Sequence, residues 1–192
     1  MNGEFIKELL SHTVKDPEEC SEKLMSHFGS AEAIFVADIH EISEVLSDDI
    51  KTAIYLKLCV ALASRRVSDA FISGRRYGED EIKEFLKAYF FGVSVETVVA
   101  ITFDRAGKFI ALDKLSEGTV NFSSVLPRKI LEVAKRRGAA SVAVAHNHPG
   151  GFATPSCDDI ESSKMLTEML RISGIDVYGH YVVAGSDCEK TE

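Results

Sequence analysis

The chain has 192 residues, which is enough for one ordinary domain and a small second one. Its formal net charge of -8 argues against a broad phosphate-binding surface, and no apolar run approaches the roughly 20 residues that span a bilayer. Four cysteines without metal-ligand spacing are expected to be reduced thiols, and the first residues do not follow the order of a signal peptide, so the expected compartment is the cytoplasm.

Residues 1–71 have the apolar periodicity of helices, and we expect them to form a small all-helical domain. The clearest start signal is Asp16 as a capping residue, with Pro17 at the first helical position and Glu19 completing a capping box. Gly29 is expected to end that helix. The helices predicted after it are 30–36, 38–46 and 47–66.

The segment 72–78 carries two glycines and two arginines with little apolar pattern, and we predict that it is a linker. Residues 79–192 then alternate between helical and strand patterns, which predicts a second domain. Its expected elements are helix 79–91, strands 95–103, 108–112 and 115–121, helix 127–138, strand 139–144, helix 158–173 and strand 175–184. This order predicts an α/β (α+β) fold in which helices flank a mixed, mainly antiparallel sheet.

Two histidines, His146 and His148, follow the apolar strand 139–144. Residues at i and i+2 of an extended chain project to the same side, so both imidazoles can meet one cation. Asp159 comes eleven residues after His148, and the turn-rich segment 149–155 can fold its carboxylate back. Two histidines and one carboxylate leave a tetrahedral zinc ion with an open position, which is typical of catalytic sites. A His-x-His pair alone is a weak signal for a metal site. The spacing of Ser156 and Asp159 after the apolar strand strengthens it.

The spacing of His146, His148, Ser156 and Asp159 resembles the motif of the JAMM (MPN) metalloprotease superfamily position by position. The fuller segment 146–159 is similar to the RadC branch of that superfamily, which usually reads His-Asn-His-Pro-Ser-Gly at its start. Here a glycine, at position 150, stands where the serine is typical, and every ligand position is kept. The resemblance covers residues 90 to 185 well and the preceding part only loosely, so residues 79–192 are identified as a RadC-type MPN/JAMM catalytic domain.

This resemblance implies a zinc-dependent metallohydrolase, a metallopeptidase or isopeptidase that acts on protein or peptide substrates. It implies that the two histidines and Asp159 hold the metal, and that Ser156 donates a hydrogen bond to the developing oxyanion. Ser156 also stands where it could cap the helix that follows. The superfamily places its general base at the start of the first strand of the catalytic domain, where this chain has Glu96. Glu117 is the alternative base.

In the RadC family the N-terminal region resembles a helix-hairpin-helix unit, whose glycine-rich turn offers backbone N–H groups to a DNA phosphate. The corresponding segment 45–51 has no glycine, and Asp48 and Asp49 stand where the phosphate would approach. We therefore expect a degenerate hairpin in residues 1–71 that gives DNA binding only weak support. Ser47 and Asp48 are predicted to cap the helix that follows.

An alternative function keeps the fold without the catalysis, as a binding or scaffold protein associated with DNA repair, because many MPN domains lack the ligands. The retention of every matched position favours the enzyme. His180 corresponds to a histidine that RadC-like sequences carry in their last strand after an aspartate, which is Gly179 here. We expect a packed strand histidine there, and a residue that orients a metal ligand is the other interpretation.

Overall fold

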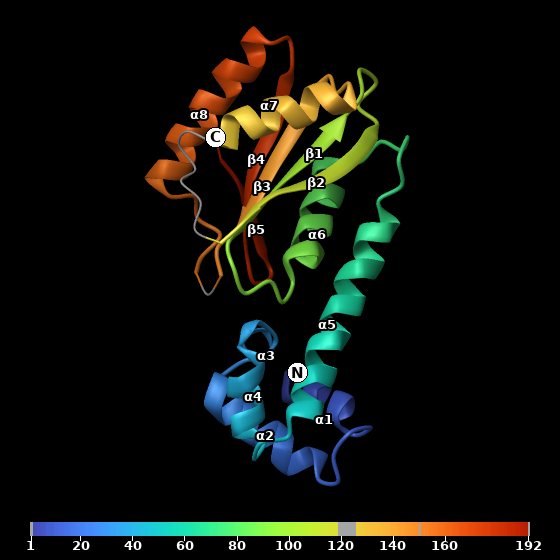
Figure 1. The fold of residues 1–192 in the computed structure, drawn as a ribbon, viewed down its shortest axis with the longest axis vertical. Coiled ribbons are helices and arrows are strands. Elements are labelled where there is room, and N and C mark those ends of the chain that lie inside the picture. Colours follow the sequence, from blue (N-terminus) through green and yellow to red (C-terminus); the bar gives the residue numbers. More distant parts are fainter. Residues whose placement is uncertain (1, 119–125, 150, 192) are drawn as a thin grey trace. The chain divides into compact units, whose positions relative to one another are not determined.

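The computed structural model describes residues 2–118, 126–149 and 151–191 (Figure 1). Contacts divide the chain into two units, Met1–Arg66 and Val67–Glu192, and the boundary falls inside the long helix α5 (Ile50–Ala70). The domain limits expected from the sequence, 1–71 and 79–192 with a linker between them, stay a prediction. Within the described ranges, no helix is both long enough and apolar enough to cross a membrane.

The N-terminal unit is helical, as the sequence predicts. Its helices before α5 are α1 (Asn2–Leu10), α2 (Pro17–Phe28), α3 (Ala31–Val36) and α4 (Ile39–Val45). Asp16 caps α2 by accepting a hydrogen bond from the Glu19 N–H at 3.1 Å, and Gly29 ends it with a left-handed φ of 80°. The Glu19 carboxylate pairs with Lys23 at 2.7 Å, so only the Asp16 half of the predicted capping box is present.

The turn between α4 and α5 differs from the sequence prediction. Ser47 and Asp48 do not cap α5, because both have left-handed backbones, with φ of 59° and 66°, and make the turn itself. Asp49 is the cap: its carboxylate accepts hydrogen bonds from the backbone N–H of Thr52 at 3.2 Å and from the Thr52 hydroxyl at 2.7 Å. One N–H of the first turn of α5, that of Thr52, is therefore satisfied by a carboxylate of the chain itself.

The second unit contains one five-stranded sheet (Figure 1). Its strands are β1 (Thr97–Phe103), β2 (Phe109–Glu117), β3 (Ser141–Asn147), β4 (Asp176–Ala184) and β5 (Asp187–Lys190). The order is β2-β1-β3-β4-β5, and only the β3–β4 pair is parallel, so the prediction of a mixed, mainly antiparallel sheet is confirmed.

Two strand predictions need correction. The stretches 108–112 and 115–121 were expected to be separate strands, but β2 runs through both as far as Glu117, and positions 119–121 lie outside the described residues. The strand β5 is not predicted from the sequence, because three of its four residues are charged and carry no apolar alternation. The segment 72–78 pairs with the start of β2, where the Gly74 N–H donates to the Phe109 carbonyl at 2.8 Å.

Helices cover both faces of the sheet (Figure 1). One face packs against α6 (Glu79–Phe90), and the other against α7 (Leu126–Arg137) and α8 (Cys157–Ile172). We call them the α6 face and the α8 face. Alternate residues of β3 supply the two clusters, because side chains of a strand alternate between its faces. Ala143 and Ala145 pack on the α6 face, and Val142 and Val144 on the α8 face.

Candidate metal centre

The last residues of β3 continue this alternation and divide their polar side chains between the two faces. His146 follows Val144 by two positions and pairs across the sheet with Val98, which belongs to the α8 cluster. The chain remains extended at His148, whose N–H donates to the Val183 carbonyl of β4 at 2.8 Å. Both imidazoles therefore lie on the α8 face, as the i, i+2 spacing predicts.

Asp159 reaches the same place from the first turn of α8. Ser156 caps this helix, since its hydroxyl oxygen accepts a hydrogen bond from the Asp159 N–H at 3.1 Å. In return, the backbone N–H and the hydroxyl of Ser156 donate to Asp159 Oδ2, at 2.8 and 2.6 Å. This reciprocal pairing fixes the carboxylate of Asp159, and the helix N-terminus favours its ionised form.

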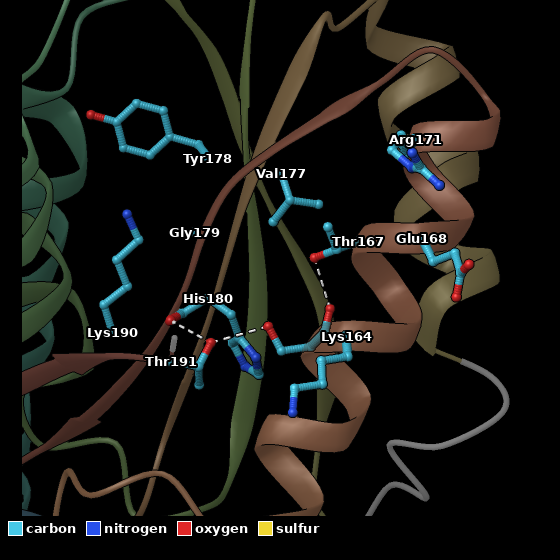
Figure 2. A pocket seen from close by; sticks show the side chains of 11 residues that line it. Lys164, Thr167, Glu168, Arg171, Val177, Tyr178, Gly179, His180, Lys190 and Thr191 are labelled. Atoms are coloured by element: carbon cyan, nitrogen blue, oxygen red, sulfur yellow. Dashed lines mark hydrogen bonds between the residues drawn. The ribbon is translucent and has the colours of Figure 1, made fainter.

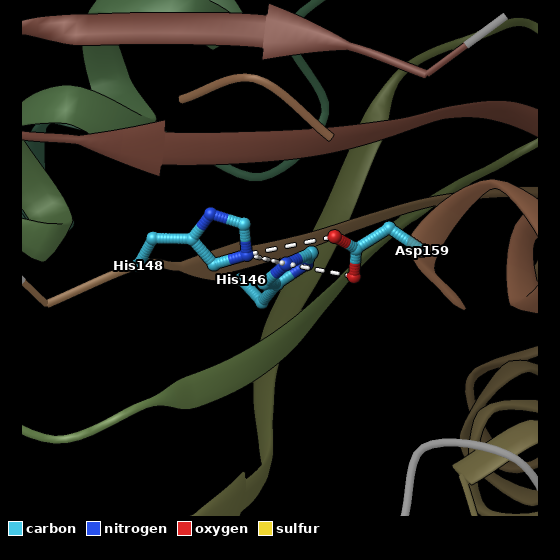
Figure 3. Close-up of side chains that lie close together, drawn as sticks. All are labelled: His146, His148 and Asp159. Carbon is cyan, nitrogen blue, oxygen red and sulfur yellow. Dashed lines mark hydrogen bonds and ion pairs between the residues drawn. The ribbon is translucent and has the colours of Figure 1, made fainter. Parts of the chain in front are cut away.

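The two imidazoles and the carboxylate converge (Figure 3). His146 Nε2 lies 3.0 Å from His148 Nε2 and 3.1 Å from Asp159 Oδ1, and His148 Nε2 lies 3.5 Å from Asp159 Oδ2. Ligand atoms placed tetrahedrally about 2.0–2.1 Å from a zinc ion would be separated by about 3.3 Å. The three side chains therefore already have the mutual spacing of a divalent metal site, and together they could hold such an ion.

Burial differs among these three residues in a way that opens the site on one side. The His146 side chain is fully buried and that of Asp159 nearly so, whereas His148 keeps 25% of its side-chain surface exposed. Burial alone would raise the pKa of Asp159, but the hydrogen bonds from His146 and Ser156 outweigh it and hold this pKa well below its usual range. Asp159 is therefore ionised at any physiological pH.

Each imidazole is also held through its second ring nitrogen. His148 Nδ1 lies 2.9 Å from the main-chain carbonyl oxygen of Phe152, in the loop that leads to α8. His146 Nδ1 lies 3.0 Å from Nε2 of His180, which is buried in β4. Such contacts orient metal ligands and set their tautomers. His180 is a buried strand residue, and the structure adds its contact with His146, which the sequence does not show.

Asn147, between the two histidines, was not singled out from the sequence. Its side chain lies on the α6 face, where its amide donates to the carbonyls of Val93 and Val95 at 3.1 and 3.2 Å. Its side-chain oxygen accepts a hydrogen bond from the Thr97 N–H at 2.8 Å. Asn147 thus joins the end of β3 to the segment that enters β1. The sequence contains one signal for this placement: Asn147 stands between two histidines that share a face of the strand, so its own side chain is expected on the opposite face.

The two carboxylates considered as general base lie on different faces. Glu96 is half-buried and immediately precedes β1, with its carbonyl accepting a hydrogen bond from the Gly118 N–H at 2.8 Å. Continuing the β1–β3 register from the Val98–His146 pair places Glu96 opposite His148, on the α8 face. Glu117 is instead paired in register with Thr97, on the α6 face, and forms an exposed salt bridge of 2.7 Å with Lys114.

The comparisons with known proteins agree with this geometry. The RadC-like JAB domain family matches residues 76–189, which includes every residue of the cluster. The chain belongs to this family. The JAB domain is part of the JAMM/MPN superfamily, so the resemblance inferred from the motif is confirmed.

Curated relatives extend the similarity to most of the chain. A UPF0758 protein of Desulforamulus reducens is 34% identical over 171 residues, covering 86% of this chain and 73% of its own length. One from Cupriavidus pinatubonensis is 30% identical over 175 residues, covering 91% and 77%. Another, from Herminiimonas arsenicoxydans, is 29% identical over 174 residues, covering 90% and 78%. The similarity therefore includes the helical region as well as the JAB domain.

Proposed function

We propose that this RadC-like protein is a zinc-dependent metallohydrolase that cleaves amide or isopeptide bonds in protein or peptide substrates. The observation that carries the proposal is the convergence of His146, His148 and Asp159 at tetrahedral spacing, at the partly exposed end of a buried strand. Three protein ligands leave one position of a tetrahedral ion open, as in catalytic rather than structural zinc sites. Two imidazoles favour zinc over magnesium, which prefers oxygen ligands.

When bound by these ligands, zinc supplies Lewis acidity that lowers the pKa of a water molecule towards about 7 and polarises a carbonyl group. The chain supplies the remaining parts of the reaction. Glu96 accepts the proton of the attacking water and returns it to the leaving amine. Its support is its place opposite His148 on the α8 face. Glu117 has no such support, because it lies on the other face and is paired with Lys114.

Ser156 is proposed to donate a hydrogen bond to the oxyanion that develops on the substrate carbonyl. Its hydroxyl has one proton, which it currently donates to Asp159 Oδ2 at 2.6 Å. That proton can serve the oxyanion only if the hydroxyl rotates, and the backbone N–H of Ser156, 2.8 Å from the same Oδ2, continues to hold Asp159 when it does. We therefore propose that the Ser156 hydroxyl donates first to Asp159 Oδ2 and then to the oxyanion.

The N-terminal unit is assigned no DNA-binding role in this proposal. In the hairpin between α4 and α5, the backbone N–H and the hydroxyl of Thr52 already donate to the Asp49 carboxylate, which occupies the helix N-terminus where a phosphate would approach. A second carboxylate, Asp48, adjoins it and would repel a polyanion. A scaffold without catalysis remains the alternative function, and it predicts no hydrolysis by any form of the protein.

Hydrolysis by the zinc-loaded chain, measured with fluorogenic peptides and with lysine-linked isopeptides, tests the proposal. Glu96→Gln should retain one zinc ion per chain and lose about 10²–10⁴-fold in rate, because a positioned base contributes roughly that factor. Glu117→Gln, the matched control on the opposite face, should keep the wild-type rate. A Glu96→Gln protein as active as the wild type would disprove the assignment of the base, and a zinc-loaded wild type inactive on both substrate types would favour the scaffold.

A further inference from the structure

His180 lies behind the candidate metal site, on the side of the His146 ring that faces away from Asp159. It belongs to β4, pairs in parallel register with Val144, and is 1% exposed. Its Nε2 atom is 3.0 Å from His146 Nδ1, and the two ring centroids are 5.1 Å apart. The imidazole of His146 is thus held between His180 at one nitrogen and the metal-binding position at the other.

A histidine that binds a metal through Nε2 carries its proton on Nδ1, and this N–H needs a hydrogen-bond acceptor when it is buried. For His148 the acceptor is the Phe152 carbonyl, 2.9 Å from Nδ1. For His146, whose side chain is fully buried, the group at that position is Nε2 of His180. The two ligand histidines are therefore supported from behind by different groups, one from the main chain and one from a side chain.

We propose that His180 is a positioning residue that accepts the Nδ1–H of His146 and so keeps the Nε2 lone pair of His146 directed at the metal. This inference rests on the metal site proposed above. Nε2 of His146 lies 3.1 Å from Asp159 Oδ1, so its imidazole connects His180 at one nitrogen with the candidate ligand cluster at the other.

The position of His180 is fixed by the helix that carries Asp159. Thr191 donates to the His180 carbonyl from its backbone N–H at 2.8 Å and from its hydroxyl at 3.3 Å (Figure 2). The hydroxyl of Ser163, in α8, lies 3.0 Å from the Thr191 hydroxyl. Ser163 is four residues after Asp159 and so lies on the same face of α8. The hydroxyl groups of Ser163 and Thr191 therefore link the helix that carries Asp159 to the main chain of His180, which supports His146.

The hydrogen bonds from Thr191 to the His180 carbonyl matter because β5 pairs with only part of β4. The β4–β5 pairing includes Tyr181–Ala184, and within the described part of the chain no strand pairs with the outer edge of β4 before Tyr181. A hollow of about 490 Å³ lies along that edge, and His180, Thr167 and Lys190 are among its lining residues (Figure 2). The two hydrogen bonds from Thr191 hold the outer edge of β4 in place at His180.

The test compares zinc binding by the full chain and by three variants at position 180, using competition with a chromophoric chelator. His180→Gln keeps an amide that reaches roughly as far as Nε2 and can either accept or donate, so its dissociation constant should stay within about threefold of the wild type. His180→Leu removes the acceptor, and His180→Asn keeps an amide that is one methylene too short. Both should weaken zinc binding by about 10–100-fold, the usual cost of losing a group that orients a metal ligand.

Two further readouts separate orientation from folding. Thermal unfolding of the metal-free variants reports whether each one folds, and the visible spectrum of the cobalt-substituted proteins reports the ligand geometry directly. We expect altered cobalt bands in His180→Asn and wild-type bands in His180→Gln. If folded His180→Leu and His180→Asn bind zinc as tightly as the wild type, His180 is a packing residue and the inference is wrong. If the wild type itself binds no zinc, the proposed function fails as well.

Discussion

The two faces of β3 use polar residues for opposite purposes. On the α8 face, the Nε2 atoms of His146 and His148 converge with the carboxylate of Asp159, and their Nδ1 atoms contact supporting groups behind them. On the α6 face, Asn147 uses its amide and its carbonyl oxygen in three hydrogen bonds to the main chain. Adjacent residues at the end of one strand therefore form a candidate metal site on one face and structural hydrogen bonds on the other. Substitutions on the two faces should separate metal binding from stability.

The largest expected effect is on metal binding, from the α8 face. His148→Ala removes one of three ligands from a side chain that is partly exposed, so zinc affinity should fall by more than about 100-fold while the fold is kept. Zinc content after dialysis, measured by mass spectrometry of the metal, checks this. Retention of one zinc ion per chain would show that His148 is not a ligand.

Acid should destabilise the α8 face through His180. Burial and the neighbouring His146 lower the pKa of His180 to about 3. An unfolded histidine has a pKa of about 6.5, so between pH 6.5 and 3 the unfolded chain binds one proton more than the folded chain. The contribution of His180 to the free energy of unfolding should therefore be fully present above pH 6.5. It should be lost as the pH is lowered through this window.

Urea unfolding of the metal-free chain at several pH values from 7.5 to 3.5 measures this loss, which should be on the order of a few kcal/mol. The matched control is His180→Leu, which has no imidazole to protonate at this position and should show a shallower pH dependence. Asp159, whose pKa is lowered, adds a loss only below about pH 4, near its unfolded pKa. Equal slopes for both proteins between pH 6.5 and 4.5 would contradict the effect assigned to His180.

On the α6 face the expected effect is on stability. Asn147→Ala leaves the buried Thr97 N–H and two carbonyl groups without their side-chain partner, which should lower the free energy of unfolding by about 1–3 kcal/mol. Zinc should still bind at the ratio of one ion per chain, because the neighbouring ligands are unchanged. Urea unfolding and zinc titration measure the two quantities, and an unchanged stability would refute the structural role of Asn147.

The smallest effect is predicted for Phe152, beside the metal site. Phe152 is 85% exposed, and it contacts His148 through its main-chain carbonyl. Phe152→Ala keeps that carbonyl, so the zinc dissociation constant should change by no more than about twofold. Chelator competition measures it. A tenfold weakening would mean that the ring, rather than the carbonyl, positions His148.

The parts of the site that the sequence predicts are those encoded over short distances. His146 and His148 share a face because the strand period is two, and Asp159 is placed by a helix start that Ser156 marks. His180 could not be placed against His146 in this way, because its position depends on the parallel register of β4 with β3. Sequence spacing carries no information about that register.

The same distinction applies to the fold. Runs of apolar and β-branched residues predict β1, β3 and β4, whereas the mostly charged residues of β5 form a strand because β4 offers them an edge. The cap of α5 was predicted at Ser47 and Asp48 and lies at Asp49, since composition suggests a cap without showing which residue takes the left-handed turn.

The central claim is that two imidazoles and one carboxylate bind the same zinc ion. X-ray absorption at the zinc edge of the loaded chain tests it most directly, because imidazole rings and sulfur atoms give different scattering. The structure predicts two imidazole ligands and oxygen donors at about 2.0–2.2 Å. A spectrum with sulfur ligands, or one without two imidazoles in the wild type, would contradict the account.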